Sequence, residues 1–106
     1  MFDKRKRLIA KWINKLQDDV WIYELDHAYN SIGLAKCDEI LQQQREQLSN
    51  LSATDEKTSH MRFKTQENIN NLEKTREQLK TLIDELNNKC SSTKQKITWL
   101  RNESQK

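Results

Sequence analysis

Apolar residues recur in this sequence with a seven-residue period, in one frame that runs along the whole chain. With Ile69 at position a of a heptad abcdefg, the later a positions are Arg76, Ile83, Cys90 and Ile97. The matching d positions are Leu72, Leu79, Leu86, Thr93 and Leu100. Only Arg76 and Thr93 depart clearly from the apolar pattern. A seam sustained over this many heptads is typical of a coiled coil.

The same frame continues toward the N-terminus without a shift. Its a positions there are Ile13, Val20, His27, Leu34, Leu41 and Leu48. Its d positions are Phe2, Ile9, Leu16, Tyr23, Asn30, Cys37, Gln44 and Leu51. The frame fails only in the middle of the chain, where the polar residues Asp55 and Arg62 fall at a and Thr58 and Thr65 fall at d. The sequence therefore has two apolar seams with a polar gap between them.

Composition supports helix over sheet, because the chain has one glycine and no proline. Tight turns and sheet corners depend on those two residue types. A chain that is 34% hydrophobic and 33% charged could also be disordered. The sustained periodicity favours an all-α fold instead.

The polar gap reads SNLSATDEKTSH over residues 49–60, and it predicts a break between two helices. Ser52 and Asp55 have the spacing of a capping box, which satisfies free amides at a helix start. We expect helix 1 over about 3–50, a turn over about 50–57 and helix 2 over about 57–103, all in a single helical coiled-coil unit spanning 1–106.

Two architectures fit this pattern. In the favoured one, two long helices form an antiparallel coiled-coil hairpin, which would place Leu34 near Leu72 and Val20 near Leu86. In the alternative, one long helix runs through the gap and forms a parallel coiled coil with another chain. The polar gap favours the hairpin, whereas the unshifted frame suits the alternative. A two-helix hairpin buries little apolar surface, so we expect it to be part of a multi-helix bundle.

Residues 20–37 carry a second apolar stripe, at heptad positions that should face water. Its members are Trp21, Ile22, Leu25, Ala28, Tyr29 and Ile32. A helix that is apolar on two sides is one buried between neighbours, and Trp and Tyr often anchor protein interfaces. The stripe therefore predicts a partner-binding face for helices of other subunits. A hetero-oligomer is favoured, and a homo-oligomer built from copies of this chain is the alternative. His27 and Asn30 lie in the seam, where polar side chains penalise wrong registers.

Basic residues concentrate near both ends of the chain, and a hairpin would bring them together. The candidates for anion binding are Lys4, Arg5, Lys6, Arg7, Lys94, Lys96 and Arg101. Most such charge runs are simply solvated. The first 16 residues are also amphipathic, as in helices that lie on membranes. A basic tip could meet an anionic membrane surface, nucleic acid or acidic proteins.

Chemistry that an enzyme would need is missing from the pattern. His27 and His60 lack the spacing of a metal site, and a glycine-rich phosphate loop is impossible with one glycine. Cys37 and Cys90 fit small seam residues of a protein in a reducing interior. We therefore expect no catalytic residues, no metal and no cofactor, and an intracellular location, cytoplasmic or nuclear.

These observations predict a non-enzymatic structural subunit of an intracellular multi-protein complex, which binds partner helices through the seam and the second apolar face. One alternative is an adaptor whose basic tip binds a membrane surface or nucleic acid. A further alternative is a self-sufficient coiled-coil homodimer, in which Cys37 would crosslink to its own copy.

Overall fold

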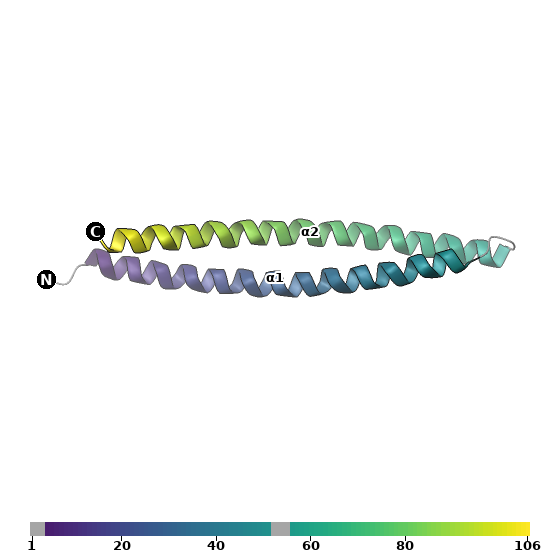
Figure 1. Ribbon diagram of the computed structural model, residues 1–106, viewed down its shortest axis with the longest axis horizontal. Helices are drawn as coiled ribbons and strands as arrows, with labels where there is room; N and C mark the ends of the chain where they lie inside the picture. The colour runs from purple at the N-terminus through teal and green to yellow at the C-terminus, as the bar shows by residue number, and fades with distance from the viewer. Residues whose placement is uncertain (1–3, 52–55) are drawn as a thin grey trace. The chain divides into compact units, whose positions relative to one another are not determined.

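The computed structural model describes residues 4–51 and 56–106, and these form two long helices (Figure 1). Helix α1 spans Lys4–Asn50 and helix α2 spans Glu56–Ser104. No strand occurs within the described residues. The all-α prediction is confirmed. Neither helix contains, in its described part, an apolar stretch that could cross a membrane.

The chain divides into two compact units, each made of one segment from each helix. The first unit combines residues 1–29 with 83–106, and the second contains residues 30–82. The purple start of α1 lies beside the yellow end of α2 in Figure 1. In this first unit Arg5 pairs with Glu103 at 3.0 Å and Glu24 pairs with Lys94 at 3.3 Å. Residue numbers therefore rise along α1 as they fall along α2.

The second unit shows the same antiparallel order. Cys37 donates a hydrogen bond from Sγ to the carbonyl oxygen of Leu72 at 3.3 Å, and Arg62 of α2 reaches the end of α1 near Leu48. Helix α1 ends at Asn50, and Leu51 is not helical. The predicted helical hairpin is thus confirmed, and the single unbroken helix is not what the chain forms.

Burial follows the heptad frame closely. Every a and d residue that the structure describes between residues 9 and 51, and again between 58 and 100, is buried or half-buried. In the first unit the buried residues are Ile9, Leu86, Thr93, Ile97 and Leu100, and in the second they are Cys37, Leu41, Thr65 and Ile69. The seam also includes the start of α2, where the frame was expected to fail: Thr65 is buried, and Thr58 and Arg62 are half-buried.

Arg62 is accommodated in the seam because it binds the end of the opposite helix. Its Nη1 donates to the carbonyl oxygens of Leu51 at 2.6 Å and of Leu48 at 3.4 Å. The last carbonyls of a helix lack intrahelical partners and carry partial negative charge. The last turn of α1 contains no basic residue, so Arg62 provides a cation there from α2. The predicted capping box at Ser52 and Asp55 lies outside the described residues, as does Phe2.

The core of the second unit is a cluster of Cys37, Leu41 and Ile69, with Leu48, Leu72 and Leu79 packed against it. Sequence reasoning placed Leu34 near Leu72. In the structure Leu72 contacts Cys37, and Leu79 lies next to Gly33. The pairing therefore lies within about one helical turn of the expected one.

Gly33 is not required by the fold, so we expect Gly33→Ala to stabilise the chain. A Cβ added at Gly33 would lie 3.9 Å from Cδ1 of Leu79, an ordinary contact, and the backbone there does not adopt positive φ. Alanine is favoured over glycine inside a helix by about 1 kcal/mol. Urea unfolding followed by circular dichroism should show a higher midpoint. A lower midpoint would mean that α1 needs a flexible position at Gly33.

Candidate partner-binding face

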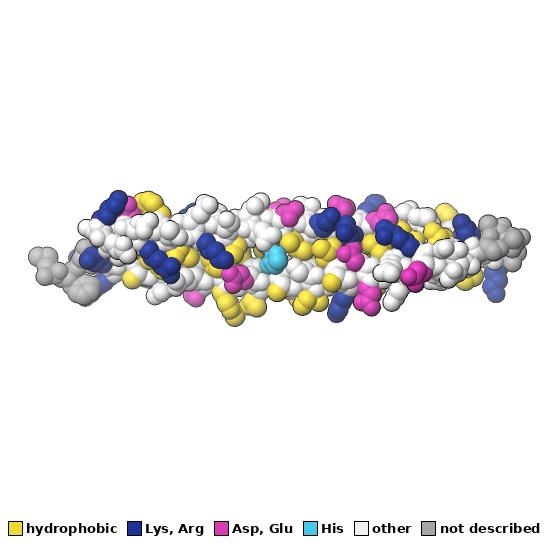
Figure 2. Space-filling view, in the orientation of Figure 1, with side chains coloured by type: hydrophobic (Ala, Val, Ile, Leu, Met, Phe, Trp, Pro, Cys, Tyr) yellow, Lys and Arg dark blue, Asp and Glu magenta, His cyan; other side chains and the backbone are white. Residues whose placement is uncertain are grey.

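The second apolar stripe lies on the side of α1 that faces away from α2. In the first unit we call it the outer apolar face, made of Trp21, Ile22, Leu25, Ala28 and Tyr29, all of which are exposed. Trp21 is 63% exposed and Tyr29 is 78% exposed. Ile32 follows one turn later on the same helix, in the second unit, and is 58% exposed. Figure 2 shows hydrophobic side chains gathered along the outer edge of α1.

Helical spacing brings these side chains together. Residues three and four apart share one face of a helix, as do Trp21, Leu25 and Ala28. The same stretch of α1 turns Val20 and Tyr23 toward the seam, where both are half-buried. A contiguous apolar patch on the order of several hundred Å² is unusual on a soluble monomer and typically marks an interaction site.

Carboxylates border the outer apolar face. On a helical wheel, Asp19 and Asp26 lie along one border and Glu24 along the other, with Asp18 at the N-terminal end of the face. Between Lys15 and Lys36 the sequence has no lysine or arginine. Glu24 pairs with Lys94 of α2 at 3.3 Å. Both of those side chains are more than half exposed, so this ion pair contributes little to stability.

Helix α2 has no comparable stripe within its described residues. Its outermost heptad positions from residue 67 to 88 are polar and exposed: Glu67, Lys74, Thr81 and Asn88. Phe63 and Trp99 are exposed but lie far apart on α2. Sequence reasoning missed Phe63, which is 69% exposed. Phe63 occupies a heptad position that should face water, and an apolar residue at such a position is the signal by which the sequence could have revealed it.

The two predicted register-setting residues lie in the seam, as the frame requires. His27 belongs to the first unit and Asn30 to the second, and both are half-buried. Their effect on register stays a prediction.

The predicted anion-binding residues all lie in the first unit and are exposed. Arg5 and Lys106 both pair with Glu103 at 3.0 Å, and Lys94 pairs with Glu24. The hydrogen bond from Lys106, followed by the charges of Lys106 and Arg5, lowers the pKa of Glu103 below its ordinary value of 4.5. This carboxylate therefore stabilises the fold above its ordinary pKa, and the contribution is lost as pH falls through the lowered value.

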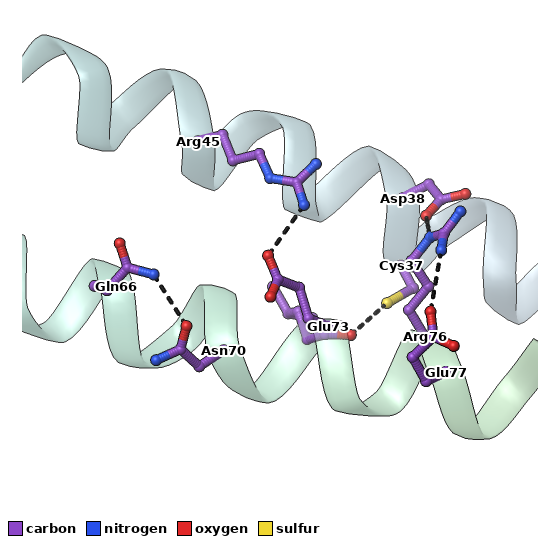
Figure 3. A network of polar contacts seen from close by, with 9 residues as sticks. Cys37, Asp38, Arg45, Gln66, Asn70, Glu73, Arg76 and Glu77 are labelled. Carbon is purple, nitrogen blue, oxygen red and sulfur yellow. Dashed lines mark hydrogen bonds and ion pairs between the residues drawn. The ribbon is translucent and has the colours of Figure 1, made fainter.

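The second unit holds a network of polar contacts between the helices (Figure 3). Arg76 occupies an a position and donates from Nε to the carboxylate of Asp38, which raises the pKa of the guanidinium. Arg45 pairs with Glu73 at 3.1 Å. These residues line an open polar groove of about 1070 Å³. The arrangement explains how the seam accepts Arg76, because its charge reaches a carboxylate at the seam's edge.

Within residues 4–51 and 56–106, no three histidine, cysteine or carboxylate side chains lie together as a bound metal ion would require. Cys37 is a buried free thiol and Cys90 a half-buried one. Comparison with known protein families, with curated proteins and with solved structures finds no match to this chain. What the fold and the site define is a helical hairpin with an exposed apolar face on α1.

Proposed function

We propose that this chain is a non-enzymatic structural subunit of a multi-protein complex, and that the outer apolar face of α1 binds partner helices. The observation that carries the proposal is the exposure of Trp21, Leu25 and Tyr29 on one side of a helix whose other side already packs against α2. In a multi-helix bundle both sides of α1 would be covered.

The modest core of the hairpin supports this proposal. Leu41 is the one large side chain, among the described residues, that is less than 2% exposed. Each helix of a pair offers only a narrow stripe to its neighbour, so a pair gains less from burial than a bundle does. Covering the outer apolar face would remove further apolar surface from water, at about 25 cal/mol per Å² before the costs of association.

The test is a comparison of double variants of the full chain, tagged and expressed in the cells that naturally make it. Trp21→Ala with Leu25→Ala should lose the co-purifying proteins, by about tenfold or more, because it removes aromatic and aliphatic anchors from the face. Both sites are exposed, so the hairpin itself should stay helical by circular dichroism. Quantitative mass spectrometry of the purified complexes gives the readout.

Leu8→Ala with Trp12→Ala is the matched control. It removes the same two residue types at the same spacing from α1, at sites about as exposed, but outside the outer apolar face. We expect this control to keep its partners, as should charge reversal at Lys4 and Lys6. The opposite pattern, with partners lost only in these two controls, would contradict the proposal and favour an adaptor that acts through its basic end.

A further inference from the structure

The carboxylates around the outer apolar face indicate the charge of the partner that this face would bind. A helix that docks on an apolar stripe places its own flanking residues beside the borders of that stripe. Here those borders hold Asp19, Asp26 and Glu24, and Asp18 lies at one end. We infer that the face takes a basic amphipathic helix of a different protein, with an apolar stripe flanked by lysine or arginine. This inference rests on the proposed function and adds the chemistry of the partner.

A second copy of the same face is a poor occupant. Two identical copies that meet through one patch are related by a two-fold axis, so residues near the axis face their own counterparts and the other contacts occur in reciprocal pairs. With Leu25 near the axis of an antiparallel contact, the same border of each copy would meet, so Asp26 would lie beside Asp26 of the other copy and Glu24 beside Glu24. Like charges at an interface oppose association. Glu24 is partly offset by Lys94, whereas Asp18 and Asp19 add further negative charge to the contact.

An anionic membrane surface is disfavoured for the same reason. Segments that bind such membranes carry lysine and arginine around their apolar face. The α1 stretch from residue 16 to 35 has Asp18, Asp19, Glu24 and Asp26 and no basic residue besides His27. The charge around the face therefore selects for cationic helices and against phosphate headgroups.

Two synthetic peptides test this inference against the full chain. Both are three-heptad helices with the same leucine stripe, one flanked by lysine and the other by glutamate, and each carries a fluorophore for anisotropy measurements. We expect the lysine-flanked peptide to bind about tenfold or more tightly than the glutamate-flanked one at low salt, and the preference to shrink as salt is added. Asp18→Asn with Asp19→Asn should reduce the preference and leave the helix content unchanged.

The variants separate failure of the inference from failure of the proposed function. Trp21→Ala with Leu25→Ala should abolish binding of the lysine-flanked peptide, and Leu8→Ala with Trp12→Ala should not. If both peptides bind equally well and the Trp21 and Leu25 variant binds neither, the inference about partner charge is overturned. The outer apolar face would still be supported as the binding site. Binding that survives this variant would count against the face itself. Binding of neither peptide would overturn the inference.

Sedimentation of the chain alone tests whether the N-terminal segment of a second copy occupies the outer apolar face. Residues 4–15 of a second copy are themselves basic and expose Leu8 and Trp12, so they could dock on the face head to tail. Such a contact does not close and would give assemblies that grow with concentration. We expect no such growth. If the assemblies of the unmodified chain grow with concentration, and if neither the Trp21 and Leu25 variant nor the Leu8 and Trp12 variant shows this growth, the face binds a second copy. That result would overturn the inference.

Discussion

Leu41→Ala is expected to destabilise the chain by about 2 to 5 kcal/mol, the usual range for deleting a buried leucine side chain. Leu41 is 1% exposed and clusters with Cys37 and Ile69 in the core of the second unit. Alanine would leave a void there, because a pair of helices held by other seam contacts can collapse only partly around it. The measurement is urea unfolding followed by circular dichroism, with a large fall in the midpoint.

Ile40→Ala is the control for this variant. Ile40 precedes Leu41 on α1 but is 44% exposed. Surface substitutions of this kind usually change stability by about 0.5 kcal/mol or less. Midpoints that fall equally in both variants would contradict the assignment of Leu41 to the seam and, with it, the heptad frame of α1.

Ile97→Ala makes the corresponding prediction for the first unit. Ile97 is 5% exposed, and deleting most of its side chain should cost about 2 to 5 kcal/mol. Trp99 lies two residues later and is 61% exposed. Trp99→Ala removes a much larger side chain, yet we expect it to cost less, because most of that side chain is already in contact with water. Unfolding midpoints of the two variants give the comparison.

The order of the two effects is the informative result. A larger loss for Trp99→Ala than for Ile97→Ala would mean that Trp99 is covered in solution, by a partner or by a second copy. Repeating the measurement over a range of chain concentrations separates self-association from the behaviour of a single hairpin, because oligomer stability depends on concentration.

Much of the fold could be predicted from the sequence because the seam repeats with a fixed period. The frame set at Ile69 identifies the inward positions of both helices. The expectation that the frame fails at Thr58, Arg62 and Thr65 was wrong, because all three are buried or half-buried. The break near Asn50 was predicted from the polar gap over residues 49–60. The same periodicity explains why the pairing was predicted only to within about a turn. A seven-residue repeat looks alike after each shift, so it says little about which heptad of α1 faces which heptad of α2.

The candidate face could be predicted from the sequence, whereas the polar contacts between the two helices could not. Trp21 and Leu25 stand out because apolar residues occupy positions that should face water. The contact of Arg62 with Leu51 was not predictable, because it depends on how a long side chain of one helix reaches a carbonyl at the end of the other. The ion pair of Arg76 with Asp38 likewise needs the register between the helices. The sequence marked Arg76 only as a departure from the pattern.

The polar outer positions of α2 have a practical consequence for experiments on this chain. Glu67, Lys74, Thr81 and Asn88 point away from the seam and are exposed, and none of them belongs to the outer apolar face. A cysteine introduced at one of these sites could carry a spectroscopic label or a surface tether, once Cys37 and Cys90 are replaced. Such a probe would report on binding at α1 without occupying the surface where binding is expected.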